Sequence, residues 1–162
     1  ERARVAAPRA GTPALDLAHE ARARGDREAT VRHLRAAVGA DPDLHNAWQE
    51  LVEVLAERGD LQGAIDALQL GLRDRPADGR LLDLLGTLYM ARGKALEAEV
   101  ALKRAVAEEP DLVPPRIKLA QVLALRGAVG EARDLLRRGI EAQPDEVALR
   151  DALSQIGAPG GR

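Results

Sequence analysis

The sequence lacks cysteine and phenylalanine altogether, and its aromatic residues are limited to Trp48 and Tyr89. Without cysteine the chain has neither a disulfide framework nor a thiolate metal site. Its apolar residues are almost entirely leucine, alanine, valine and isoleucine. Leucine and alanine are strong helix formers, and the aromatic and β-branched enrichment that marks strands is missing. The composition therefore predicts an all-α protein.

Long apolar runs and an excess of positive charge are missing as well. No run approaches the roughly 18 residues that a membrane span requires, so we expect no direct membrane insertion. The net charge is only −2, which does not provide the basic field typical of nucleic-acid binding. The chain begins at Glu1 rather than methionine, so the sequence is compatible with the removal of a signal peptide or anchor. It is equally compatible with a location in the cytoplasm or in the periplasm. Arginine far outnumbers lysine, a bias that we interpret as that of a GC-rich bacterial genome.

What the sequence does contain is a repeat of 34 residues. The dipeptide Arg-Gly occurs four times at this spacing, and proline marks a second position with the same period. The glycines are Gly25, Gly59, Gly93 and Gly127, and the prolines are Pro42, Pro76, Pro110 and Pro144. A fixed period of this length indicates an array built from one repeated supersecondary unit.

Each period has the pattern of two amphipathic helices. In the third copy, apolar residues follow helical spacing at Leu82, Leu85 and Tyr89, and Gly93 then supplies a helix stop. A second helix is expected over about 96–106, and proline ends the unit because it lacks the donor that a helix interior needs. By the same register, the second helices should begin near positions 27, 61, 95 and 129.

The tripeptide Arg-Gly-Asp, familiar as an adhesion signal, occurs at residues 24–26 and 58–60. In the other two copies its third position is Lys94 or Ala128, so the aspartate is not an invariant part of the repeat. Aspartate is a good N-terminal helix cap. We therefore interpret the tripeptide as the turn between two helices rather than as a receptor signal.

This pattern resembles the tetratricopeptide repeat family, whose repeats follow W-x₂-L-G-x₂-Y, then A-x₃-F, then P. The third copy matches it with Leu82, Leu85-Gly86, Tyr89, Ala98, Leu102 and Pro110. The second copy keeps the register with Trp48, Leu51, Leu55, Ala64, Leu68 and Pro76, and the fourth with Arg116, Leu119, Leu123, Ala132, Leu136 and Pro144. The first copy is the weakest, with Ala14, Leu17, Ala21, Thr30, Leu34 and Pro42. The resemblance implies a right-handed superhelical solenoid of antiparallel helix pairs.

The register predicts a linear domain organisation. Residues 1–10 form a linker or flexible arm, repeats occupy 11–44, 45–78, 79–112 and 113–146, a capping helix covers 147–156, and 157–162 form a tail. Thr12 is expected to cap the first helix, with Pro13 at its first helical position. Leu85 and Leu119 are expected to be buried between helices.

The sequence offers no catalytic set. Ser154 is the only serine and has no histidine near it in sequence. The three histidines, His19, His33 and His45, lack the spacing of a helical metal site. The glycines form no phosphate-cradling loop. We predict a protein that is not an enzyme and uses no cofactor or metal.

In the resembled family, the first helix of each repeat lines a concave groove that holds a segment of a partner protein. Carried over by register, the resemblance implies a set of groove residues in this chain. They are His19, Arg22, Asn46, Gln49, Glu50, Glu53, Glu57, Asp83, Thr87, Met90, Ile117, Gln121 and Leu125.

One part of this predicted groove is acidic. Residues 41–76 carry three basic and eight acidic side chains, and Glu50, Glu53 and Glu57 share one helix face, the acidic stripe. Such a stripe is either a solvated helix face or a docking strip for a basic peptide, and both interpretations stay open here.

The leading functional hypothesis is a non-enzymatic scaffold that binds another protein or a peptide. A second hypothesis is self-assembly, in which Arg2, Arg4 and Arg9 of one copy occupy the acidic groove of the next. A third is a repeat domain that recruits substrates for a larger enzyme. Nucleic acid is disfavoured as a partner because the predicted groove is not basic. The sequence names no particular partner.

Overall fold

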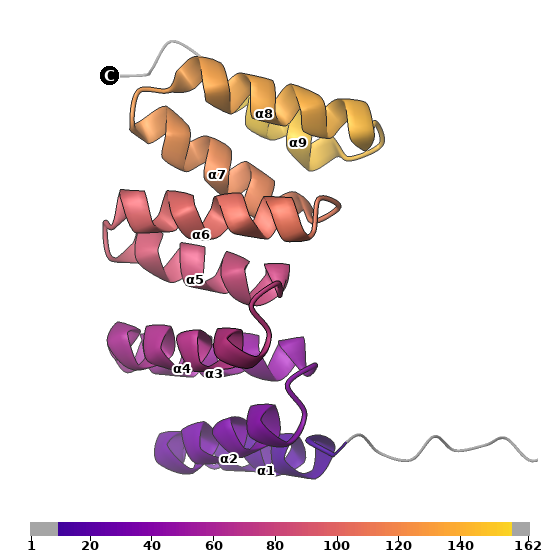
Figure 1. Ribbon diagram of the computed structural model, residues 1–162. Helices are drawn as coiled ribbons and strands as arrows, with labels where there is room; N and C mark the ends of the chain where they lie inside the picture. The colour runs from indigo at the N-terminus through magenta and orange to yellow at the C-terminus, as the bar shows by residue number, and fades with distance from the viewer. Residues whose placement is uncertain (1–9, 157–162) are drawn as a thin grey trace, which may run out of the picture. The chain divides into compact units, whose positions relative to one another are not determined.

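The computed structural model describes residues 10–156, and all regular elements within that range are α-helices (Figure 1). In chain order they are α1 (Thr12–Ala23), α2 (Arg27–Ala40), α3 (His45–Glu57), α4 (Leu61–Asp74), α5 (Gly79–Ala91), α6 (Ala95–Glu108), α7 (Val113–Leu125), α8 (Val129–Ala142) and α9 (Val147–Gln155). They divide into two compact units whose boundary, between Ala67 and Leu68, lies inside α4. The first unit contains α1 to α3, and the second contains α5 to α9.

The turn inside each helix pair is built around the repeated glycine. The four glycines are the described residues with positive φ, at 75°, 76°, 69° and 85° for Gly25, Gly59, Gly93 and Gly127. A side chain with a Cβ resists this left-handed conformation, which explains why glycine stands there in every copy. The second helices begin at residues 27, 61, 95 and 129, as the register predicts.

The aspartates of the two Arg-Gly-Asp tripeptides are helix caps. The Oδ1 atom of Asp26 accepts a hydrogen bond of 2.9 Å from the Ala29 N–H, and Asp60 accepts one of 2.8 Å from the Gly63 N–H. Each bond satisfies one of the amides that the first helical turn leaves without a partner. Lys94 and Ala128, at the same position, make no such side-chain bond. The tripeptide is thus a turn followed by a cap.

The start of α1 differs from the prediction. Gly11 is the N-terminal cap residue and Thr12 is already helical, with no side-chain cap bond. The reason is a close approach of the chain to its neighbours. A Cβ on Gly11 would lie 2.5 Å from the Leu44 Cδ1 atom and 2.6 Å from the Ala37 carbonyl oxygen. Glycine therefore lets the backbone enter the helix one residue earlier than the Thr-Pro pair suggests.

The core of each unit consists of aliphatic side chains. In the first unit, Leu34 and Leu51 are fully buried, and alanines such as Ala18 and Ala47 let the helices approach closely. In the second unit, one cluster joins α6, α7, α8 and α9. It consists of Ala98, Leu102, Leu119, Ala120, Val122, Leu123, Ala132, Leu136, Leu149, Ala152 and Ile156. Leu85 is also buried, so both leucines singled out in the sequence lie where the register predicts.

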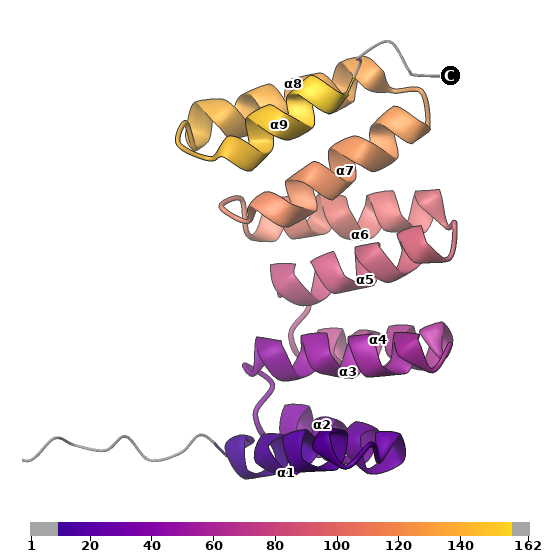
Figure 2. The ribbon, with the colours of Figure 1, turned by 180° about the vertical axis from the view of Figure 1, so that it is seen from behind.

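Helix α9 packs against both α7 and α8 and buries Leu149, Ala152 and Ile156. It lies behind α8 in Figure 1 and in front of it in Figure 2. Its first residue, Val147, follows the first residue of α7 by one full repeat. The last described helix therefore continues the periodic pattern.

Arginine substitutes for tryptophan at one recurring position. In α3, the Trp48 Nε1–H donates to the Pro42 carbonyl at 3.0 Å. The same repeat position is Arg116 in α7 and Arg150 in α9. The Arg116 Nη2 atom donates to the Pro110 carbonyl at 2.6 Å, and the Arg150 Nη2 atom donates to the Pro144 carbonyl. Arg116 is only 8% exposed, because its apolar stem packs against Gly139. A side chain at position 139 would clash with that stem. Both side chains combine an apolar body with an N–H donor at the tip, so either residue can hold the preceding proline loop.

Candidate interaction surface

The sequence-predicted groove residues lie on the first helix of each pair. Those of the first unit are on α1 and α3, and those of the second unit are on α5 and α7. One position recurs in all four helices at the 34-residue period and is exposed in each of them. Its residues are His19, Glu53, Thr87 and Gln121.

In the first unit, α1 and α3 form a charged cluster. The His19 Nε2 atom lies 3.0 Å from Oε2 of Glu50. Arg22 lies 4.0 Å from Glu50 and 3.7 Å from Glu57. Two carboxylates of the acidic stripe therefore already have cationic or hydrogen-bonding neighbours on α1.

These pairs are open to solvent. The side chains of Arg22 and Glu57 are 44% and 53% exposed. Exposed ion pairs at this separation contribute only about 0–1 kcal/mol to stability, because water screens them and ordering two long side chains costs entropy. The middle residue, Glu53, is exposed and accepts a hydrogen bond of 3.0 Å from the Gln49 side chain. The stripe can therefore exchange its internal partners for others at little cost.

In the second unit the corresponding face is almost neutral. The Asp83 carboxylate is bound by Lys118 Nζ at 2.8 and 2.9 Å, and its side chain is only 15% exposed. The Thr87 hydroxyl donates to the Asp83 carbonyl at 2.9 Å. The sequence reasoning did not include Lys118. Lys118 follows Asp83 by one repeat plus one residue, and this spacing is the feature of the sequence that could have identified the pair.

The remaining residues of that face are of two kinds. Met90 and Ile117 are partly buried and pack against the core of the second unit. Gln121 is exposed, and Leu125 is 83% exposed. The exposed part of this face consists of Thr87, Gln121 and Leu125, and Met90 and Ile117 support it from below.

A buried charge that the sequence reasoning missed connects α6 and α7. Glu99 is buried, its Oε1 lies 2.5 Å from Lys103 Nζ, and its Oε2 is paired with Arg126. The sequence did contain a signal of this buried charge, because the position of Glu99 is occupied by the apolar residues Val31 and Ile65 in the first two copies. A buried carboxylate is stable only when it is paired. The two cations fulfil that need, so Glu99 is a packing feature of the second unit.

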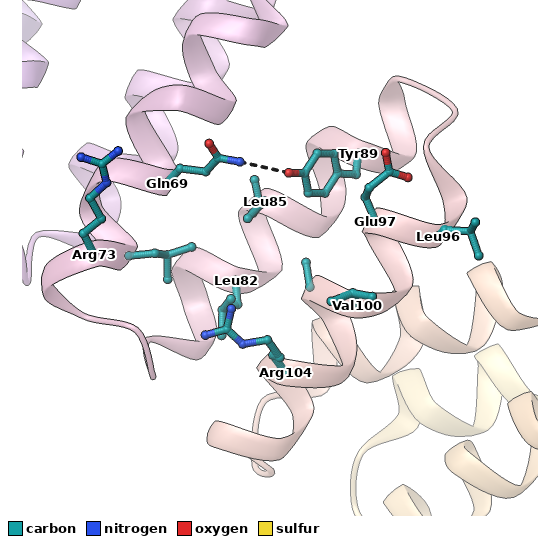
Figure 3. Close-up of a pocket in the computed structure, with 11 residues that line it drawn as sticks. Gln69, Arg73, Leu82, Leu85, Tyr89, Leu96, Glu97, Val100 and Arg104 are labelled. Carbon is teal, nitrogen blue, oxygen red and sulfur yellow. Dashed lines mark hydrogen bonds between the residues drawn. The ribbon is translucent and has the colours of Figure 1, made fainter.

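A cavity of about 480 Å³, which the sequence did not predict, opens between the C-terminal end of α4 and the helices α5 and α6 (Figure 3). Its walls are mostly apolar, with Leu72, Leu82, Leu85 and Val100 among them. All its residues belong to the second unit.

Within residues 10–156, no three His, Asp or Glu side chains gather in an arrangement that could hold a metal ion. None of the helices in that range combines the length and the apolar character needed to span a bilayer.

The helix pairs, their glycine turns and their proline phase are those of one known family. A family model described as tetratricopeptide repeat matches residues 21–88 and, a second time, residues 89–156. The chain belongs to the tetratricopeptide repeat family, and its fold is the all-α repeat solenoid of that family. No curated protein matches the chain.

Solved structures agree on the fold. The chain is similar to MamA protein, with 20% identity, 91% of this chain and 80% of that chain covered, and a TM-score of 0.68. It is similar to YrrB, described as a TPR protein with an unusual peptide-binding site, with 20% identity, coverage of 90% and 75%, and a TM-score of 0.63. A third is TTC0263, a thermophilic TPR protein of Thermus thermophilus, with 20% identity, coverage of 91% and 98%, and a TM-score of 0.56. Identities this low establish the shared fold alone.

Proposed function

We propose that this chain is a non-enzymatic interaction module that binds a segment of a partner protein on the exposed face of its first helices. The observation that carries the proposal is the recurring position occupied by His19, Glu53, Thr87 and Gln121. The core positions around it repeat as aliphatic residues, whereas this position is exposed in every copy and its chemistry changes from copy to copy. A variable exposed position on an otherwise regular scaffold is suited to recognition, because packing does not dictate its residue.

The chemistry of the first unit favours a partner segment with basic residues. Three glutamates lie within two turns of α3, and α1 supplies one arginine and one histidine against them. The cluster therefore keeps an excess of negative charge. A lysine or arginine from a partner would replace Arg22 in pairs that are already solvated, so binding requires little desolvation.

The test uses a capped peptide of alternating arginine and alanine as the probe. It is titrated calorimetrically into the 162-residue chain and into the double variant Glu53→Lys/Glu57→Lys, at low and at high salt. We expect the wild-type affinity to fall as salt rises, because exposed charges are screened over about 8–10 Å at physiological ionic strength. The double variant should bind more weakly at low salt, with an unchanged circular dichroism spectrum.

A matched control separates the acidic stripe from net charge. Glu108→Lys/Glu141→Lys makes the same change of charge on the exposed surfaces of α6 and α8. This control should retain the wild-type affinity. Equal weakening in the two double variants, or equal affinity of the stripe variant and the wild type at low salt, would remove the stripe from the mechanism.

The self-assembly hypothesis places Arg2, Arg4 and Arg9 in the same acidic groove, and these residues lie outside the described part of the chain. Sedimentation velocity over a range of protein concentrations distinguishes the two hypotheses. A partner-binding module stays at one mass, whereas head-to-tail contacts between copies produce species that grow with concentration.

A further inference from the structure

The cavity in the second unit adjoins an exposed apolar surface on a second helix, away from the first-helix positions discussed above. Leu96 and Val100 of α6 both line it, and each is 62% exposed. Leu82 and Leu85 of α5 line the same cavity and are buried (Figure 3). A cavity of about 480 Å³ is within the size range of small-ligand and side-chain pockets.

The other copies show that the fold does not require this apolar surface. One repeat earlier, the positions of Leu96 and Val100 are occupied by Gln62 and Asp66. One repeat later they are occupied by Gly130 and Asp134. A solvent-facing position that is polar in the neighbouring copies and apolar in the third indicates a surface that another molecule covers.

The same recess exists one repeat later with a different lining. A cavity of about 380 Å³ there has charged side chains on its walls. They are Lys103, Glu131, Asp134 and Arg138. The helix geometry therefore produces the recess in both copies, and the third copy differs in having Leu96 and Val100 where the fourth has Gly130 and Asp134.

The two ends of the apolar cavity carry different charges. At one end, beside Leu82, lies the Arg104 guanidinium, whereas Arg73 lies on α4 beside Gln69 (Figure 3). Arg104 donates from Nη2 to the Pro76 carbonyl at 2.8 Å, which fixes its guanidinium and leaves its other N–H groups for a ligand. At the other end lies Glu97, near Tyr89, whose hydroxyl oxygen accepts a hydrogen bond of 3.2 Å from Gln69. Glu97 precedes Arg104 by seven residues, which is about 10 Å along a helix.

From this arrangement we infer a second binding site that takes a partner peptide with an apolar side chain and, within a few residues of it in the sequence, a carboxylate. The apolar side chain enters between Leu82, Leu85 and Val100, and it covers the surface that these residues leave exposed. The carboxylate lies against Arg104, whose planar guanidinium group suits it. At the opposite end Glu97 is already paired with Lys94 at 3.4 Å, so the carboxylate lies at the Arg104 end. This site does not depend on the first-helix face.

The probe is an array of short peptides, acetylated and amidated so that side chains supply the only charges. Each peptide carries one leucine, isoleucine, methionine or phenylalanine and one aspartate at a varied distance before or after it. A parallel set carries lysine in place of aspartate. We expect the full chain to bind a subset of the aspartate peptides and to bind their lysine counterparts roughly tenfold more weakly or worse.

The first variant for this test borrows residues from a neighbouring copy, so it is compatible with the fold. Leu96→Gln/Val100→Asp introduces the residues that the second copy has at these positions. It should reduce binding of the best aspartate peptide by about tenfold or more. Arg104→Glu should abolish the preference for aspartate over lysine. The matched control, Val147→Gln on α9, changes an apolar residue that is 60% exposed and should bind as the wild type does.

Three results would overturn the inference. The first is an array in which no aspartate peptide binds better than its lysine counterpart. The second is that no peptide binds but decanoate does, and that Leu96→Gln/Val100→Asp removes the decanoate binding. That result would make the cavity a site for a small amphiphile. The third is concentration-dependent dimerisation of the wild type that the same variant removes, again without peptide binding, which would assign the surface to a second copy of this chain. Circular dichroism of each variant verifies that it is folded.

Discussion

The first-helix faces of the two units share one register and differ in chemistry. In the first unit, His19 and Arg22 of α1 face the glutamates of α3, so the surface is charged and paired within itself. In the second unit, one pair, Asp83 with Lys118, lies at the edge of a surface made of Thr87, Gln121 and Leu125. The repeat determines where a side chain lies, and the individual residue determines what that side chain can bind.

The difference extends to how the units are held together. The first unit caps its second helices with Asp26 and Asp60, whereas α6 and α8 begin without a side-chain cap. The second unit instead contains the Glu99 pair and the arginine that replaces tryptophan. Charged side chains thus cap the second helices of the first unit, whereas in the second unit they support the interior and, through Asp78, the start of α5.

Emptying the core tests whether the units unfold separately, and we expect the largest effect there. Leu51 and Leu85 occupy the same repeat position, and both are buried. Each leucine-to-alanine change should lower the free energy of unfolding by about 2–5 kcal/mol. Because repeats contact only their neighbours, hydrogen exchange should increase first in the unit that carries the change. An unchanged melting temperature for Leu85→Ala, or uniform exchange across both units, would contradict this packing.

Exchanging the helix caps between units should have a smaller effect. Asp60→Ala should destabilise the protein by about 1 kcal/mol, because the Gly63 amide loses its acceptor. Ala128→Asp should stabilise the second unit by a similar amount, since the turn geometry is the same in every copy. Urea denaturation measures both. If Ala128→Asp gave no gain, the start of α8 would differ from that of α4 in a way that the shared turn does not explain.

The smallest expected change in stability comes from Arg22→Ala. The pairs of Arg22 with Glu50 and Glu57 are solvated, so we expect a loss of less than about 1 kcal/mol. The affinity for the arginine–alanine peptide should rise, because the variant leaves these carboxylates without that cation. Calorimetry at low salt measures the affinity, and Arg35→Ala, an exposed arginine on α2, is the control for net charge. A fall in affinity would show that Arg22 itself contacts the ligand.

Much of the fold could be predicted from the sequence because its signals are local or strictly periodic. A glycine with positive φ ends each first helix, a proline follows each unit, and leucines recur at the core spacing. The helix starts near 27, 61, 95 and 129 follow from these features alone. Thr12 was the exception, since the entry to α1 depends on how closely Gly11 approaches Leu44 and Ala37.

The candidate surfaces could be predicted only as positions. The register placed His19, Glu53, Thr87 and Gln121 on first helices, where the structure has them exposed. The register did not reveal that Arg22 reaches Glu57 or that Lys118 binds Asp83. It also placed Met90 and Ile117 in the groove, although both are partly buried and pack against the core. Side chains that are 31 or 35 residues apart meet because helices pack side by side, and spacing along the chain does not encode which rotamers they adopt.

The sequence by itself thus determined the helix pairs, their turns and the aliphatic core, since backbone conformation and helical periodicity depend on residues a few positions apart. Tertiary structure alone decided the partners of the acidic stripe and the apolar cavity beside Leu96 and Val100. Both depend on the shape left between packed helices. That shape is set jointly by several elements, so no single stretch of sequence contains it.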